Sequence, residues 1–145
     1  MISFEGKTVL VTGGGGGIGR GIAEAFGSYG AQVVVAELKQ ERADAVRSAL
    51  AAAKADHMVL RIDVRQEAQV NDLMKQIDER FGKLDVLVNN VGTASPPKRF
   101  ELTTNEDWDF DYQINIRHMF LVTRAAIPLI RKTSAGGSII NFSSI

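Results

Sequence analysis

Short apolar runs alternate with longer stretches of helical periodicity along this chain. The apolar runs are Lys7–Thr12, Gln32–Glu37, Met58–Asp63, Leu84–Asn89 and Ser138–Phe142. Several of them are apolar at consecutive positions rather than at alternate ones. Strands that are buried on both faces of a parallel sheet show this pattern. The runs therefore predict five strands of one parallel sheet.

The intervals between these runs show the period of amphipathic helices. One stripe of apolar residues spaced three and four apart comprises Val70, Leu73, Met74, Ile77 and Phe81. Gly82 follows this stripe and Gly30 follows Tyr29, so both glycines are candidate helix C-caps. Strands and helices in strict alternation imply right-handed crossovers and a doubly wound α/β sheet.

A long helix is predicted from Asn105 to about Arg131. Thr103 and Glu106 have the spacing of a capping box at its start. We find no internal repeat and no low-complexity linker, and 145 residues is close to the commonest size of one domain. The sequence therefore predicts one Rossmann-type domain over residues 1–145.

The composition excludes several classes of function. The 17 Lys and Arg residues balance the 17 Asp and Glu residues, so nothing favours nucleic acid or an anionic membrane as a partner. The chain has no Cys, which excludes thiol catalysis, disulfides and thiolate metal sites. We predict no metal site. There is no signal peptide and no apolar run that could span a membrane, so we expect a cytoplasmic protein.

A glycine-rich turn follows the first predicted strand and opens a helix. Its glycines fit Gly-x-Gly-x-x-Gly (Gly14, Gly16, Gly19) and two other spacings, which begin at Gly13 and use Gly16 or Gly17. Glycine permits a tight turn and close approach of backbone amides to a pyrophosphate at a helix N-terminus. A Walker A loop is excluded because no Gly-Lys-Ser/Thr follows. The alternative is a flexible loop that binds nothing.

Glu37 ends the second predicted strand, 18 residues after Gly19. A carboxylate there can accept hydrogen bonds from the adenosine ribose hydroxyls. It would repel a 2′-phosphate, at a cost of roughly 4 kcal/mol per pair at about 4 Å and an effective dielectric of about 20. No Arg is expected beside it, and only Lys39 could soften the repulsion. We therefore expect NAD(H) rather than NADP(H); the alternative is a solvated Glu37 at the start of the next helix.

Four motifs in order resemble the compact branch of the short-chain dehydrogenase/reductase family. They are Thr12–Gly19, the Asn-Asn-Val-Gly segment 89–92, Asn115 and the segment Gly137–Ser144. The resemblance covers essentially the whole chain, and it implies five parallel strands in the order 3-2-1-4-5 with helices on both faces. It also implies an oxidoreductase that transfers hydride between nicotinamide and a secondary alcohol or ketone.

The resemblance assigns cofactor contacts to Gly13, Gly16, Gly17, Ile18, Gly19, Glu37, Asp63, Val64, Asn90, Val91 and Gly92. Among these, Asp63 would contact the adenine amino group, with Val64 beside it. The segment 90–92 would pass the adenosine ribose and the nicotinamide side, and Val91 replaces the family's usual Ala. Asn89 is expected to tie neighbouring strands together.

Asn115 and Ser144 resemble two of the four catalytic residues of the family. Asn115 would bend the helix and hold a water of the proton relay, and Ser144 would hydrogen-bond the substrate oxygen. The alternatives are an ordinary polar helix residue and a strand-end cap. The loop Thr93–Phe100 leaves the strand beside the cofactor, so it is a candidate for the substrate wall. The resemblance also implies a homo-oligomer, a dimer or tetramer, because the long helix is the element through which the family commonly associates.

The family's catalytic Tyr-x-x-x-Lys pair does not occur in this sequence. Tyr29 and Tyr112 are its only tyrosines, and neither has Lys four residues later. His57 and His118 are not expected to replace the pair. We therefore expect the chain to be the N-terminal part of a longer enzyme, inactive alone. The alternative is a non-catalytic NAD-binding or regulatory module.

Overall fold

A computed structural model describes residues 2–53, 56–133 and 136–143. Its strands are β1 (Thr8–Thr12), β2 (Gln32–Glu37), β3 (His57–Arg61), β4 (Val86–Asn89) and β5 (Ser138–Asn141). They form one parallel sheet in the order β3-β2-β1-β4-β5, which confirms the predicted topology. The predicted strand ends differ from the observed ones by no more than one or two residues.

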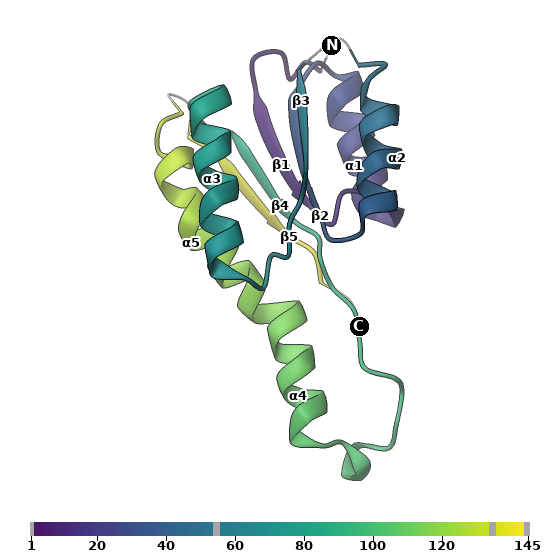
Figure 1. Ribbon diagram of the computed structural model, residues 1–145. Coiled ribbons are helices and arrows are strands. Elements are labelled where there is room, and N and C mark those ends of the chain that lie inside the picture. Colours follow the sequence, from purple (N-terminus) through teal and green to yellow (C-terminus); the bar gives the residue numbers. More distant parts are fainter. Residues whose placement is uncertain (1, 54–55, 134–135, 144–145) are drawn as a thin grey trace.

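Helices cover both faces of the sheet, as predicted (Figure 1). They are α1 (Gly17–Ser28), α2 (Gln40–Leu50), α3 (Glu67–Phe81), α4 (Asn105–Tyr112) and α5 (His118–Ile130), with the 3₁₀ turn η1 (Phe100–Leu102) and the π turn η2 (Gln113–Arg117). In Figure 1, α1 and α2 lie on one side of the sheet, and α3 and α5 lie on the other. With helices on both faces, the central strands β2, β1 and β4 are almost wholly buried.

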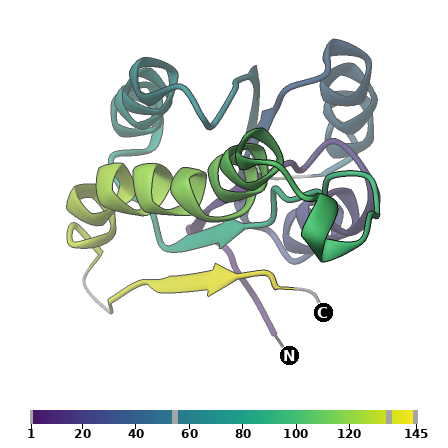
Figure 2. The same ribbon diagram turned by 90° about the horizontal axis from the view of Figure 1, so that it is seen from below.

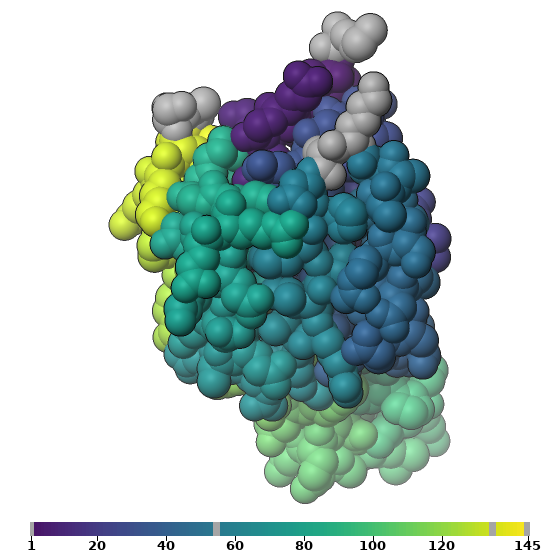
Figure 3. All heavy atoms as spheres, turned by 45° about the horizontal axis from the view of Figure 1, so that its top comes forward, coloured from purple at the N-terminus to yellow at the C-terminus, as the bar shows by residue number. Residues whose placement is uncertain are grey.

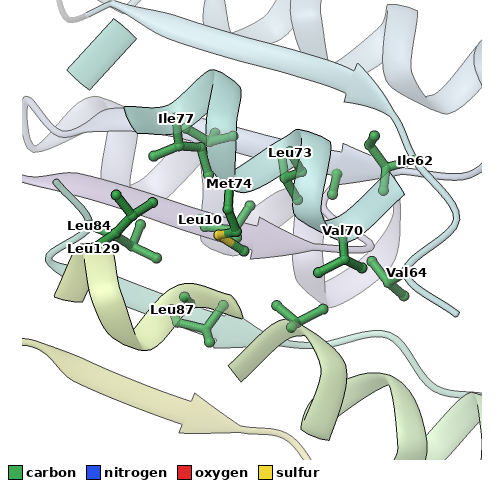
Figure 4. Packing of buried hydrophobic residues seen from close by; sticks show 14 of the residues in the cluster. Leu10, Ile62, Val64, Val70, Leu73, Met74, Ile77, Leu84, Leu87 and Leu129 are labelled. Atoms are coloured by element: carbon green, nitrogen blue, oxygen red, sulfur yellow. The ribbon is translucent and has the colours of Figure 1, made fainter. Parts of the chain in front are cut away.

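Successive residues of the central strands pack on opposite faces. Val9 and Val11 belong to the cluster under α1 and α2, whereas Leu10 belongs to the cluster under α3 and α5. The second cluster includes the predicted stripe on α3, with Leu73 and Ile77 fully buried (Figure 4). Because every residue of β1 is buried, the glycine turn that follows it starts from a fixed point.

Both predicted glycine caps are confirmed. Gly82 has a φ of 72° at the end of α3, and its amide donates to the Asp78 carbonyl at 2.9 Å. Gly30 has a φ of 88° directly after the cap residue Tyr29. Glycine adopts this left-handed conformation without the steric cost of a Cβ, so each helix ends where the sequence indicates.

The predicted capping box was one position too early. Thr104, not Thr103, accepts a hydrogen bond from the Asp107 amide, and the Asp107 carboxylate accepts one from the Thr104 amide at 2.8 Å. Thr103 instead ends the 3₁₀ turn, where its amide donates to the Phe100 carbonyl. Either Thr could cap in isolation, and the preceding turn decides between them.

The predicted long helix is continuous from Asn105 to Ile130, but it is not uniform. Five residues in its middle, Gln113–Arg117, form a π turn. Figure 2 shows that α5, the second part of this helix, runs alongside β4 and β5. The segment that holds α4 and η1 projects beyond the end of the sheet (Figure 1). Its green atoms form the lower end of the molecule in Figure 3.

The outermost strand β5 is exposed along its length, as expected for a sheet edge. The side chains of Ile139 and Ile140, and of Phe142 beyond the strand, are each 42% exposed. Directly before β4, the buried Asp85 carboxylate accepts a hydrogen bond from the Thr8 backbone amide at 2.9 Å. This bond fixes the start of β1 against β4.

Candidate functional site

A cavity of about 550 Å³ opens at the carboxyl ends of the central strands. Ligands of open parallel α/β sheets bind at this edge. The lining residues are Gly13, Gly16, Gly17, Ala36, Glu37, Leu38, Lys39, Arg42, Ile62, Asp63, Val64, Arg65, Asn90, Val91, Gly92, Thr93 and Ile114. All the predicted cofactor-binding residues except Ile18 and Gly19 are among them.

The glycine turn leaves the first amides of α1 open to the cavity side. Gly13 and Gly17 have φ values of 64° and 51°, a conformation that a residue with a side chain adopts only under strain. The helix starts at Gly17 with Gly16 as its N-cap, and no side chain caps it. No acidic residue lies in its first turn, and Ile18 is 68% exposed there. These uncapped amides fit an anionic diphosphate.

Gly19 brings α1 against the turn and against the end of β4. A Cβ on Gly19 would lie 2.4 Å from the Asn90 amide nitrogen and 2.4 Å from the Gly13 carbonyl oxygen. The Asn90 side chain donates to the carbonyls of Thr12 and Gly13, at 3.1 and 3.2 Å. Asn90 therefore ties β4 to the glycine turn through this narrow space, and only glycine fits at position 19.

Glu37 is bound to the glycine turn. Its side chain is 5% exposed, and its carboxylate accepts hydrogen bonds from the amides of Gly15 at 3.0 Å and Lys39 at 3.1 Å. A Cβ on Gly15 would lie 2.7 Å from the Glu37 Cγ. Each carboxylate oxygen keeps a lone pair, so Glu37 can orient the turn and still accept bonds from sugar hydroxyls.

The expectation that no Arg lies beside Glu37 was wrong. Arg42 is five residues after Glu37, in the first turn of α2, and its side chain lies against the glycine turn. Its Cβ would be 2.8 Å from a Cβ on Gly15, and its guanidinium carbon would be 3.4 Å from one on Gly16. Arg42 is not a sequence neighbour of Glu37, but the start of α2 brings the two residues to the same part of the glycine turn.

Asp63 lies in the cavity but is already paired. Its carboxylate accepts hydrogen bonds from the Arg65 side chain at 2.9 and 2.8 Å and from the Arg65 amide at 3.0 Å. The Arg65 guanidinium, outweighing burial, lowers the pKa of Asp63. Val64 is buried beside it in the cluster under α3.

The segment after β4 forms the far wall of the cavity. Val91 lies with its Cγ2 3.1 Å from the position of a Cβ on Gly13, which is the tight contact that its extra methyl groups lead one to expect. Gly92 lies at the cavity wall, where a Cβ would be 3.1 Å from the Asn115 side-chain oxygen. The Asn89 side chain lies toward β5 instead. Its side-chain amide donates to the side-chain oxygen of Asn141 at 2.8 Å, which confirms the prediction that Asn89 ties neighbouring strands together.

Asn115 lies in the π turn and braces this wall. Its side-chain oxygen accepts a hydrogen bond from the Thr93 amide at 3.1 Å, and its side-chain nitrogen donates to the Thr93 carbonyl at 2.7 Å. The same nitrogen donates to the Asp111 carbonyl at 3.0 Å, four residues back in the helix. Asn115 thereby links the widened helix turn to the loop that leaves the cavity, and π turns are frequent at functional sites.

His118 is a feature of the site that the sequence did not reveal. It was not expected to take part in catalysis, and it is fully buried at the start of α5. Neither ring nitrogen has a hydrogen bond of normal geometry within the described residues, although the Val91 backbone is close enough to raise the pKa. Burial is the larger effect and lowers the pKa of His118 below its ordinary value. The buried His118 ring thus lies near the Val91 backbone, which belongs to the cavity wall.

This burial predicts a loss of stability in acid. The unfolded His118 takes up a proton below about pH 6.5, whereas the folded one stays neutral until its lower pKa is reached. Its contribution is thus fully present above about pH 6.5 and is lost as the pH falls toward the folded pKa, at about 1.4 kcal/mol for each unit between the two pKa values. Urea unfolding across this range measures it.

A His118→Leu variant serves as the comparison for that measurement. The slope of unfolding free energy against pH in mildly acidic solution should be shallower in the variant than in the wild type. His57→Gln, at the start of β3, is the matched control and should keep the wild-type contribution from His118. An unchanged slope in His118→Leu would show that the buried imidazole is not the group responsible.

The remaining predicted residue, Ser144, lies outside the described residues. Ser143 before it is exposed, two residues beyond the end of β5. Within residues 2–53, 56–133 and 136–143, no group of His, Asp and Glu has the geometry of a metal site. In the same part of the chain, no helix combines the length and apolar character needed to cross a membrane.

Comparison with known proteins gives a consistent set of relatives. A family model described as short chain dehydrogenase matches residues 7–145. L-fucose dehydrogenase of Bos taurus is 38% identical over 142 residues, which are 98% of this chain and 50% of that protein. The 2,5-dichloro-2,5-cyclohexadiene-1,4-diol dehydrogenase of Sphingobium indicum is 39% identical, over 98% of this chain and 56% of that protein. The chain thus spans about half the length of these relatives.

Solved structures share the fold over the same extent. A 7α-hydroxysteroid dehydrogenase, solved with NADH and 7-oxo glycochenodeoxycholic acid, matches with a TM-score of 0.89 and 30% sequence identity. The match covers 98% of this chain and 55% of that one. The similarity therefore includes the sheet, the glycine turn and the long helix together.

Proposed function

Because this chain belongs to the short chain dehydrogenase family, we propose that it holds NAD(H) at its glycine turn and supplies one half of an alcohol or ketone oxidoreductase site. The observation that carries the proposal is the convergence of the uncapped α1 amides, Glu37 and the 90–92 segment around one cavity. A relative solved with NADH supports the same cofactor class.

Different residues of this cavity would bind different parts of the dinucleotide. The first amides of α1, at Gly17 and Ile18, would hold the diphosphate. Glu37 would accept hydrogen bonds from the adenosine ribose hydroxyls, and Asp63 would contact the adenine amino group. The nicotinamide end would lie along the wall from Val91 to Thr93. All of these residues except Ile18 line the cavity, which supports this division.

The cofactor supplies the hydride chemistry, and the chain positions the reactants. Nicotinamide accepts hydride from a secondary alcohol or donates it to a ketone. Asn115 fixes Thr93 and with it the wall beside the reacting end. Ser144 would hydrogen-bond the substrate oxygen. We propose that the Tyr and Lys of the proton transfer belong to a part of the protein that corresponds to the second half of the relatives.

The relatives suggest the substrates to test first. Their names cover a sugar, a cyclic diol and a hydroxysteroid, all of which carry a ring hydroxyl. The intact protein would be assayed with aldoses, cyclic diols and hydroxysteroids by following the absorbance of NADH. Oxidation of at least one class with NAD is expected. Tight NAD binding without turnover of any secondary alcohol or ketone would overturn the proposed reaction.

Substitution of Glu37 tests the cofactor assignment. Glu37→Gln removes the charge and leaves one oxygen to serve the amides of Gly15 and Lys39. A hydrogen bond to a charged group is worth about 1.5–3 kcal/mol, so we expect NAD affinity to fall at least about tenfold. Calorimetric titration measures it. Glu41→Gln, the same change at an exposed site in α2, is the control; equal affinities in both variants would remove Glu37 from the site.

A further inference from the structure

Polar side chains of the long helix hold the loop that follows β4. Figure 1 shows this loop leaving the sheet and returning through η1 and α4. Asn115 binds the backbone of Thr93, which lines the cavity. One turn earlier in the helix, Asp111 accepts hydrogen bonds from the Ser95 amide at 2.9 Å and from the Ser95 hydroxyl at 3.0 Å. Asp111 therefore fixes the loop two residues beyond the tie that Asn115 makes.

A third contact continues the same series. Lys98 pairs with Asp107, one further turn toward the start of α4. The helix residues Asp107, Asp111 and Asn115 are four positions apart, so they share one face of the helix. Four helical residues rise about 6 Å, and two or three extended loop residues span roughly 7–11 Å at most. An extended loop can therefore meet the three side chains in turn.

The tie at Ser95 leaves the loop little freedom to move. Ser95 and Asp111 are both half-buried, and Asp111 forms no ion pair within the residues that the structure describes. Pro96 and Pro97 follow Ser95, and the ring of each fixes its φ angle. Thr93, at the cavity, is only two residues before Ser95. The position of Ser95 thus determines where the loop leaves the cavity wall.

We propose that Asp111 is a positioning residue of the substrate site: by holding Ser95 it keeps the loop 93–98 in place as one wall of that site, and so it determines which alcohols or ketones fit. The proposal rests on the proposed oxidoreductase function. A carboxylate suits this task because hydrogen bonds to a charged acceptor are about twice as strong as neutral ones. Thr93 lines the cofactor cavity and Ser95 does not, so loss of the tie should change substrate binding more than dinucleotide binding.

Steady-state kinetics of the intact protein test the proposal, with its best substrate and with a bulkier secondary alcohol of the same class. Asp111→Ala removes both bonds to Ser95. KM for the best substrate should rise at least about tenfold, because the charge-assisted bonds that hold the wall are lost, and kcat should change less than KM. The ratio of kcat/KM for the best substrate to kcat/KM for the bulkier alcohol should fall at least about fivefold. The Kd for NADH, measured by calorimetric titration, should stay within about twofold of the wild-type value.

Three further variants separate this role from a general disturbance of the helix. Asp111→Asn keeps an oxygen that accepts from Ser95 and should restore most of the selectivity. Ser95→Ala removes only the hydroxyl bond, from the loop side, and should lower the selectivity by a smaller factor than Asp111→Ala. Asp109→Ala is the matched control, because Asp109 is exposed in the same helix and its side chain forms no hydrogen bond in the segments that the structure describes. It should leave KM, kcat and selectivity unchanged.

The outcomes distinguish this proposal from the one on which it rests. If the wild type binds no NADH or converts no secondary alcohol or ketone, the proposed function fails and the role of Asp111 fails with it. If the wild type is active and Asp111→Ala keeps its KM and selectivity, or loses affinity for NADH as much as for substrate, the role of Asp111 is refuted and the proposed function stands.

Ser95→Ala decides the matter if Asp111→Ala does not fold, because a loop hydroxyl can be removed without altering the helix. Unchanged selectivity in Ser95→Ala would then refute the role of Asp111. A rise in KM with loss of selectivity in Asp111→Ala, in the same direction in Ser95→Ala and absent from Asp109→Ala, supports it.

Discussion

Gly19→Ala is expected to weaken binding of NADH by at least about tenfold and to destabilise the fold by about 1–3 kcal/mol. The added Cβ would lie 2.4 Å from the Gly13 carbonyl oxygen, which belongs to the backbone and cannot rotate away. Helix α1 must therefore move outward from the turn. That movement shifts the amides of its first turn away from where they face the cavity.

Gly21→Ala is the matched control, two residues later in the same helix. A Cβ there meets nothing within 4 Å, and the residue is exposed. Removing a glycine from a helix interior should stabilise the protein by about 0.5–1 kcal/mol and leave NADH affinity as it was. Calorimetry and urea unfolding of both variants measure the difference. Gly19→Ala behaving like Gly21→Ala would contradict the close packing of α1 on the turn.

Asn115→Ala is expected to lower the rate of hydride transfer by about 100-fold, mostly in kcat. The substitution removes both hydrogen bonds to the Thr93 backbone and the bond to the Asp111 carbonyl. The wall beside the reacting end then loses its tie to the helix, and a displacement of about 1 Å can cost 10²-fold in rate. Steady-state kinetics on the intact enzyme, with its best substrate, measure kcat and KM separately.

Gln113→Ala serves as the control for a substitution within the π turn. Gln113 is exposed, and its side chain forms no hydrogen bond in the described part of the chain. Asn115→Asp adds a second comparison, since a carboxylate can still accept from the Thr93 amide but cannot donate to the Thr93 carbonyl. A kcat for Asn115→Ala within about threefold of the value for Gln113→Ala would show that the Thr93 link does not support catalysis.

Much of the fold was predictable because each of its signals is local. The consecutive apolar residues of β1 and β2 indicate strands that are buried on both faces, and all of β1 is. The stripe on α3 lies in the core, and Gly30 and Gly82 end helices where they stand in the sequence. For these elements, local propensity and tertiary packing favour the same structure.

The features that were missed depend on contacts between segments. Arg42 reaches the glycine turn only because α2 starts where β2 ends, and Glu37 is held by an amide 22 residues earlier in the chain. The π turn at Asn115 accompanies its bonds to Thr93, which lies in the loop after β4. His118 is buried although histidine is polar, because α5 packs against the end of β4. No local pattern in the sequence indicates such contacts.

The cofactor site is tested most directly by a crystal structure of the intact protein with NADH bound. The diphosphate should lie within hydrogen-bond distance of the backbone amides of Gly17 and Ile18, and the adenosine ribose hydroxyls should contact the Glu37 carboxylate. Density for NADH in another cleft, with the glycine turn left in contact only with solvent, would contradict the assignment.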